Sequence, residues 1–276
     1  MTKGTMENTT SKFLPDRNST PADSPADSLV EQLENRLCEQ NWREALVISQ
    51  RMCEEMPDHG PVWEMRGLIE AQLECIEDSI ASLESASLLV PLEAYSSRIL
   101  ALQYHGTGRE SLGLDLLVAL GQNPSTPMDL VRAILHDLHR FQDGNRALQV
   151  LAAALSTHPD DADLWHEMSA VQSWTNHSPE ECLVSIAKAI ELSPSDPRFR
   201  ITASNLLQRM GMPTDAYACL CLIPDAAIAE IDCSCCMQRM LDMFYQYEDW
   251  RRVGLCRQRL ADLKPGTGCP DKNLPR

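Results

Sequence analysis

The sequence predicts an all-α fold in which about seven pairs of helices stack one after another. Two observations carry this prediction. Hydrophobic residues make up 43% of the 276 residues and aromatic residues only 5%, with Leu and Ala abundant, and this composition favours packed helices over strands. Prolines also recur at a period near 34 residues, which lies in the range of helical repeat proteins.

The recurring prolines mark where helix pairs are expected to end. Successive members of the series lie 34, 33, 35 and 35 residues apart, and they are Pro57, Pro91, Pro124, Pro159 and Pro194. A proline has no amide hydrogen to donate, and its ring collides with the preceding turn of a helix. Each proline of this series is therefore expected to close the second helix of a pair.

Two further residue types keep the same period. Residues that are mostly small lie 12 positions before a proline, and they are Ala45, Ser79, Ala147, Cys182 and, ahead of Pro265, Val253. Large apolar or aromatic residues lie another 16 or 17 positions back, and they are Trp63, Tyr95, Val131, Trp165 and Met237. We expect the large residue to begin an amphipathic helix, and the small one to let a second helix approach it closely.

The clearest unit runs from Met128 to Pro159. Its first helix places apolar side chains on one stripe at helical spacing, namely Val131, Ile134, Leu135 and Leu138. A turn follows at residues 142–145, where glycine and asparagine are expected to supply left-handed backbone. The second helix then carries Ala147, Leu151 and Ala154 on its inner face.

These residues resemble the tetratricopeptide repeat. The segment from Ser178 to Pro194 is similar to the second helix and closing proline of that family, and the segment from Asn41 to Leu46 is similar to its turn and helix start. The resemblance implies a right-handed α-solenoid of about seven helix-turn-helix repeats. The units begin near Asp27, Gly60, Leu92, Met128, Ala162, Pro197 and Ser234. The second helix of the sixth unit is expected to stop short at Pro224, before an irregular join over residues 225–232.

The domain organisation follows from the same pattern. We expect one helical repeat domain over residues 27–265. Residues 1–26 are polar and rich in Ser, Thr, Asp and Pro, so they are expected to form a disordered arm. Residues 266–276 are expected to form a flexible tail.

Charge and composition exclude several classes of function. The formal net charge of −16 argues against nucleic acid as the main ligand, because the phosphate backbone rewards a basic face. The sequence shows no apolar run near the ~20 residues of a membrane helix and no secretory signal, so we expect a cytoplasmic protein without membrane contact. It also lacks a phosphate-binding glycine loop and a Gly-x-Ser-x-Gly elbow. We therefore expect no enzyme and no cofactor.

The resemblance implies that first helices line a concave groove through the second, fifth, ninth, twelfth and thirteenth positions of each unit. In the third unit these positions include Ser96, Leu100, Gln103 and Tyr104. From the fourth unit on they supply the candidate peptide-binding residues Arg132, His136, His139, Arg140, His166, Trp174, Asn205, Arg209 and Tyr245. Arginine forks bind carboxylates, and Trp174 or Tyr245 could receive an apolar side chain. The sequence thus predicts a non-catalytic scaffold or adaptor for an acidic or C-terminal peptide segment or a protein surface.

Other interpretations stay open. The groove residues could be ordinary solvated side chains, neutralised by Asp129, Asp137 and Glu167. The solenoid could instead associate with itself through its end units. The last helix would decide this through Trp250, Leu255, Leu260 and Leu263, which either cap the stack or form an apolar patch. The oligomeric state is therefore not predicted.

A metal site is a further alternative, and the residues argue against it. His136, His139 and His166 could face one another, but Arg132 and Arg140 flank the same face and would repel a cation. The cysteine cluster comprises Cys219, Cys221, Cys233, Cys235 and Cys236. Its pairs are spaced by one residue, which departs from zinc patterns, and such neighbours on a helix are expected to point to opposite sides. We expect these cysteines to serve mainly in packing.

Overall fold

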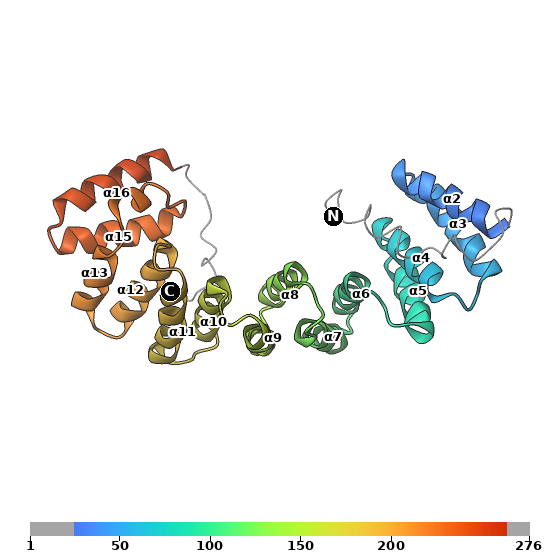
Figure 1. Ribbon diagram of the computed structural model, residues 1–276, viewed down its shortest axis with the longest axis horizontal. Coiled ribbons are helices and arrows are strands. Elements are labelled where there is room, and N and C mark those ends of the chain that lie inside the picture. Colours follow the sequence, from blue (N-terminus) through green and yellow to red (C-terminus); the bar gives the residue numbers. More distant parts are fainter. Residues whose placement is uncertain (1–24, 264–276) are drawn as a thin grey trace. The chain divides into compact units, whose positions relative to one another are not determined.

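The computed structural model describes residues 25–263, and this part of the chain is α-helical with no strand (Figure 1). The predicted arm lies outside the described residues except for residues 25 and 26, which begin the first helix, and the predicted tail lies outside them entirely. No described helix is both long and apolar enough to cross a bilayer.

The described helices form seven pairs and one extra turn. The first helices of the pairs are α2 (Pro25–Cys38), α4 (Gly60–Gln72), α6 (Ala94–Gly106), α8 (Met128–Arg140), α10 (Ala162–Trp174), α12 (Pro197–Arg209) and α15 (Ser234–Gln246). The second helices are α3 (Trp42–Glu55), α5 (Ile76–Leu89), α7 (Glu110–Gln122), α9 (Gly144–Thr157), α11 (Pro179–Leu192), α13 (Pro213–Cys221) and α16 (Trp250–Asp262). Five first helices begin at the residue where the sequence placed the start of a unit. The fold is thus the predicted all-α solenoid of helix pairs.

The described residues divide into two compact units. The N-terminal unit extends to Leu120 and includes Thr126–Leu130, whereas the C-terminal unit comprises Gly121–Ser125 and the described residues from Val131 on. Within each unit, most helices that follow one another in the chain pack side by side, as α4 does with α5 and α10 with α11. The small-residue positions of the repeat, Ala45, Ser79, Ala147, Cys182 and Val253, are all buried, with exposed fractions of 3% or less. Their burial confirms that they lie where paired helices approach each other.

The turn between the two helices of each pair contains one residue with left-handed backbone. These residues are Gln40, Glu74, Gly108, Gln142, Asn176, Gly211 and Glu248, and their φ values lie between 56° and 84°. In the fourth repeat the left-handed residue is Gln142. The prediction that glycine and asparagine supply this conformation is therefore wrong there. Gly144 instead begins α9, and a Cβ on it would lie 3.1 Å from a ring carbon of Trp174. Glycine is therefore needed at this position for close approach rather than for its φ.

Side chains at the helix starts explain why the helices begin where they do. Asp143 accepts a hydrogen bond from the backbone N–H of Arg146, and Ser178 forms a capping box with Glu181. In two repeats, an indole N–H forms a hydrogen bond to the end of the preceding repeat. Trp63 donates to the carbonyl of Pro57 and Trp165 to that of Pro159, each at 2.8 Å.

The N-terminal unit buries two carboxyl groups. Glu64 on α4 accepts a hydrogen bond from the backbone N–H of Glu93 at 2.9 Å, so it joins α4 to the start of α6. Burial raises the pKa of Glu64. Glu70 accepts from Arg66 at 2.8 Å and from the hydroxyl of Ser82 at 2.6 Å. Both buried groups are therefore satisfied, and they fix the positions of neighbouring helices.

The sixth repeat departs from the others as the sequence predicted. Its second helix, α13, has 9 residues and stops before Pro224. A single turn, α14 (Asp225–Ile228), lies within the join that follows. Ile228 and Ile231 of this segment enter the same core cluster as Phe244 of α15. The irregular segment thus contributes two side chains to the core of the C-terminal unit.

Candidate functional site

In the N-terminal unit, four of the five predicted groove positions of the third repeat are buried, whereas the fifth, Glu93, is exposed. Ser96, Leu100, Gln103 and Tyr104 have exposed fractions of 8% or less. Gln103 donates to the hydroxyl of Ser79 at 2.8 Å, and Tyr104 donates to Glu84 at 2.9 Å. These side chains hold α6 against α5, so the prediction that they line an open groove is wrong. In the third repeat, helix packing thus uses four positions that the resemblance assigned to the groove.

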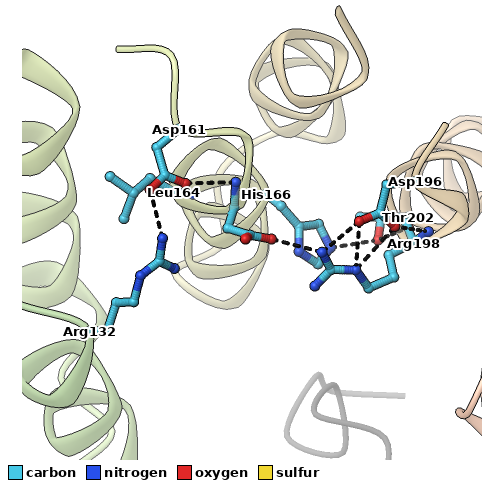
Figure 2. A network of polar contacts seen from close by, with 8 residues as sticks. Arg132, Asp161, Leu164, His166, Asp196, Arg198 and Thr202 are labelled. Atoms are coloured by element: carbon cyan, nitrogen blue, oxygen red, sulfur yellow. Dashed lines mark hydrogen bonds and ion pairs between the residues drawn. The ribbon is translucent and has the colours of Figure 1, made fainter. Parts of the chain in front are cut away.

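In the C-terminal unit, the corresponding positions are more exposed and connect successive first helices. Arg132 on α8 donates to Asp161 at 2.6 Å (Figure 2). Asp161 is the N-cap of α10, where its other carboxylate oxygen accepts from the backbone N–H groups of Asp163 and Leu164. Asp161 is a residue that the sequence reasoning missed. The sequence pattern that could have identified it is an aspartate directly before a predicted helix start.

A similar arrangement joins α10 to α12. Asp196 caps α12 and also binds the guanidinium of Arg198 (Figure 2). The same guanidinium donates to Asp163 at 2.9 Å. His166 hydrogen-bonds the hydroxyl of Thr202 at 3.0 Å, and its ring lies 5.2 Å from that of Phe199. The side chains of α8, α10 and α12 thus form a continuous polar row across the unit. We call this row the α8–α12 face.

Trp174 lies near the end of α10, with polar neighbours on both sides. The ring of His139 on α8 lies 5.2 Å from the indole, between centroids. Arg209 on α12 donates to Ser173 at 2.6 Å. Trp174 is half-buried, since α9 approaches it closely at Gly144. This part of the α8–α12 face therefore combines a fixed aromatic surface with a nearby arginine.

Glu167 on α10 adds an ionisable group to the same unit. Burial, together with the charges of Asp163 and Asp161, raises the pKa of this carboxyl to about 7, although Arg132 opposes the shift. Glu167 therefore changes its charge close to neutral pH. Of the carboxylates that the alternative interpretation named as partners for arginine, Asp137 is buried, and Arg132 binds Asp161 instead.

The other predicted residues are less connected to this face. His136 and Arg140 are exposed on α8, and the guanidinium carbon of Arg140 lies 5.2 Å from the ring centroid of Phe141. Asn205 is half-buried on α12. Tyr245 on α15 is 54% exposed, and its ring packs edge-on against that of Trp250 of α16, with 5.3 Å between centroids.

The three predicted histidines do not form a group of metal ligands. Among the described residues, the one group of three or more potential ligands whose ligand atoms lie within 4.8 Å of one another is that of Cys233, Cys235 and Cys236. The expectation that Cys233 and Cys235 point to opposite sides is wrong, because Cys233 precedes α15 as its N-cap and does not follow helical geometry.

Comparisons with known proteins agree with the repeat architecture. No protein-family model matches the sequence, and no curated protein matches it. Among solved structures, the C-terminal part of a TPR repeat-containing protein from Cytophaga hutchinsonii is similar with a TM-score of 0.58 and 12% identity, over 86% of this chain and 95% of that one. A Naa15/Naa10 structure bound to HypK-THB has a TM-score of 0.57 and 10% identity, over 85% of this chain. This chain covers 36% of the Naa15/Naa10 chain that it matches.

At these identities the likeness concerns the fold. Together with the seven turns and the buried small residues, it shows that this chain has the fold of tetratricopeptide-repeat proteins.

Proposed function

We propose that the protein is a non-catalytic scaffold, and that its C-terminal unit binds a segment of a partner protein across the α8–α12 face. One observation carries the proposal. Three successive first helices present partly exposed charged and aromatic side chains in a continuous row, including Arg132, His166, Trp174 and Arg209. A row of this kind suits an extended peptide, because each repeat offers it a further set of contacts.

The charges favour an acidic or C-terminal segment as the ligand. Arg132 and Arg198 bind carboxylates of this chain, whereas Arg209 donates to a neutral hydroxyl and Arg140 lies over an aromatic ring. The guanidinium groups of Arg209 and Arg140 are therefore available to bind a carboxylate of the ligand. The ion pair between Arg132 and Asp161 is partly exposed and therefore contributes little free energy. Arg132 can thus exchange Asp161 for a carboxylate of the ligand at a small cost in free energy.

Trp174 supplies the apolar part of the site. Its indole is held between His139 and the start of α9, so little side-chain entropy is lost when a ligand packs on it. Aromatic and arginine side chains are the types that dominate binding energy at protein interfaces. The Naa15/Naa10 structure, which is bound to HypK-THB, is consistent with a role in protein complexes for this fold. The cytoplasmic location stays a prediction from the sequence.

A charge-reversal experiment tests the proposal. The triple variant Arg132→Glu, Arg140→Glu and Arg209→Glu places three negative charges on the α8–α12 face. Its matched control, Arg43→Glu, Arg51→Glu and Arg257→Glu, makes the same change at exposed positions on α3 and α16. Binding of a library of acidic C-terminal peptides is measured by fluorescence anisotropy, with circular dichroism to confirm folding.

We expect the site variant to lose at least about tenfold in peptide affinity, which corresponds to the loss of one charged contact of about 1.4 kcal/mol or more. The control is expected to stay within about twofold of the wild type. Equal affinities of the two variants would show that the α8–α12 face is only a solvated surface.

A further inference from the structure

Three cysteine sulfurs meet at the start of α15. The Sγ atoms of Cys233, Cys235 and Cys236 all lie within 4.8 Å of one another, and those of Cys233 and Cys235 are 2.9 Å apart. All three residues are half-buried, so an ion can reach them from solvent while part of their surroundings is protein. Cys233 and Cys236 also pack against the core cluster around Phe244.

The backbone explains why the sulfurs converge. Cys233 is the N-cap of α15, with φ −90° and ψ 110°, so its side chain folds back over the first turn. Its sulfur accepts a hydrogen bond from the backbone N–H of Cys236 at 3.2 Å. A cap acceptor next to the positive end of a helix is stabilised as an anion, and the thiolate is the form that binds metals.

The segment before the cysteines is fixed by α16. The guanidinium of Arg259 donates to the carbonyl of Ile231 at 2.9 Å and to the carboxylate of Asp232 at 2.6 Å. Ile231 itself is buried in the core. The chain therefore reaches Cys233 in a set position, which lowers the entropy cost of gathering the three sulfurs around an ion.

The donor set indicates the kind of cation. Three thiolates are soft ligands, which favour copper(I) and zinc among the common metal ions. Structural zinc sites use four protein ligands, and in the described part of the chain this group has three. With metal–sulfur bonds of about 2.3 Å, as in zinc thiolates, a planar three-coordinate ion needs sulfurs about 4 Å apart, which small side-chain rotations supply here.

We propose that Cys233, Cys235 and Cys236 bind one copper(I) ion as a three-thiolate site. On binding, the thiols release their protons to solvent and no change of oxidation state takes place.

The test uses the full chain, reduced and kept free of oxygen, titrated with copper(I) against the chromogenic chelator bicinchoninate. The site variant is Cys233→Ser, Cys235→Ser and Cys236→Ser. Serine at position 233 can still cap α15, so the fold is expected to persist, and circular dichroism checks this. The matched control is Cys219→Ser and Cys221→Ser, which removes two cysteines of α13 in the same unit.

We expect the wild type and the control to take one equivalent of copper(I) more from the chelator than the site variant takes. The wild type is also expected to show a near-ultraviolet band of copper–thiolate charge transfer that the site variant lacks. Equal copper uptake by wild type and site variant would overturn the proposal. So would preferential binding of zinc, measured with a zinc-sensitive dye under the same conditions.

Discussion

Glu167 is a carboxyl group whose surroundings disfavour its charged form. Its pKa is raised to about 7, mainly by burial, although Arg132 lies close enough to oppose the shift. The unfolded chain ionises this group near its ordinary pKa of 4.5. Because the folded state holds the proton more tightly, Glu167 makes a contribution to the free energy of unfolding that depends on pH. This contribution is fully present below pH 4.5 and is lost as the pH rises to about 7.

The variant Glu167→Gln should remove this loss, because glutamine carries no proton that titrates. We expect the free energy of unfolding of the wild type to fall by about 1–2 kcal/mol more than that of the variant between pH 5 and pH 8. Chemical denaturation at both pH values measures it. The control Glu191→Gln changes an exposed carboxylate on α11 and should behave like the wild type. A parallel pH dependence of Glu167→Gln and wild type would contradict this account.

Among the elements, the turns between paired helices show how the chain keeps its period. Each turn needs one residue with left-handed backbone, and in five of the seven this residue is not glycine. A side chain in that conformation costs about 1 kcal/mol, because its Cβ crowds the following carbonyl. The repeat therefore forms through its packing, with local strain at several of its turns.

Two substitutions in the N-terminal unit test this interpretation. Glu74→Gly should raise the free energy of unfolding by about 0.5–1 kcal/mol, since glycine adopts its φ of 62° without strain. Gly108→Ala should lower it by about 1 kcal/mol, although a Cβ there would meet no atom within 4 Å. Urea denaturation measures both changes.

Gly106→Ala is the matched control for the turn experiment. A Cβ at Gly106 also meets no atom within 4 Å, but this residue is the last of α6 and its φ is not positive. It should therefore be neutral or slightly stabilising. If the alanines at 106 and 108 have the same effect, backbone strain is not what distinguishes the turn.

For the whole molecule, the last helix bears on self-association. Leu255, Leu260 and Leu263 are half-buried and pack against the core of the C-terminal unit, whereas Trp250 is 58% exposed beside Tyr245. The outer side of α16 carries exposed polar residues such as Arg257 and Gln258. Helix α16 is thus a cap with a polar outer surface, of the kind that ends a stack of repeats.

We therefore expect the protein to be a monomer. Static light scattering over a hundredfold dilution should give a constant mass near the 30.9 kDa of one chain. A mass that doubles at high concentration would favour the self-associating solenoid. The variant Trp250→Ser would then show whether the exposed indole is responsible.

The predicted helix starts at Gly60, Met128 and Pro197 agree with the structure because they rest on local signals. A proline, a capping side chain or a small residue acts on the backbone within one or two turns, so its effect can be read along the chain. The row of candidate residues from Arg132 to Arg209 followed from the same register. Its restriction to the repeats from the fourth on followed from the types of residue at those positions.

The sequence by itself determined the repeat, its period and the positions at which its helices meet. The tertiary structure decided which of the first-helix positions are exposed, because burial depends on how each helix pair packs against the next. It also decided that Arg132 meets the cap residue Asp161 and that three cysteine sulfurs converge at α15. Such meetings depend on side-chain directions at helix ends, where the regular geometry used to read a sequence no longer holds.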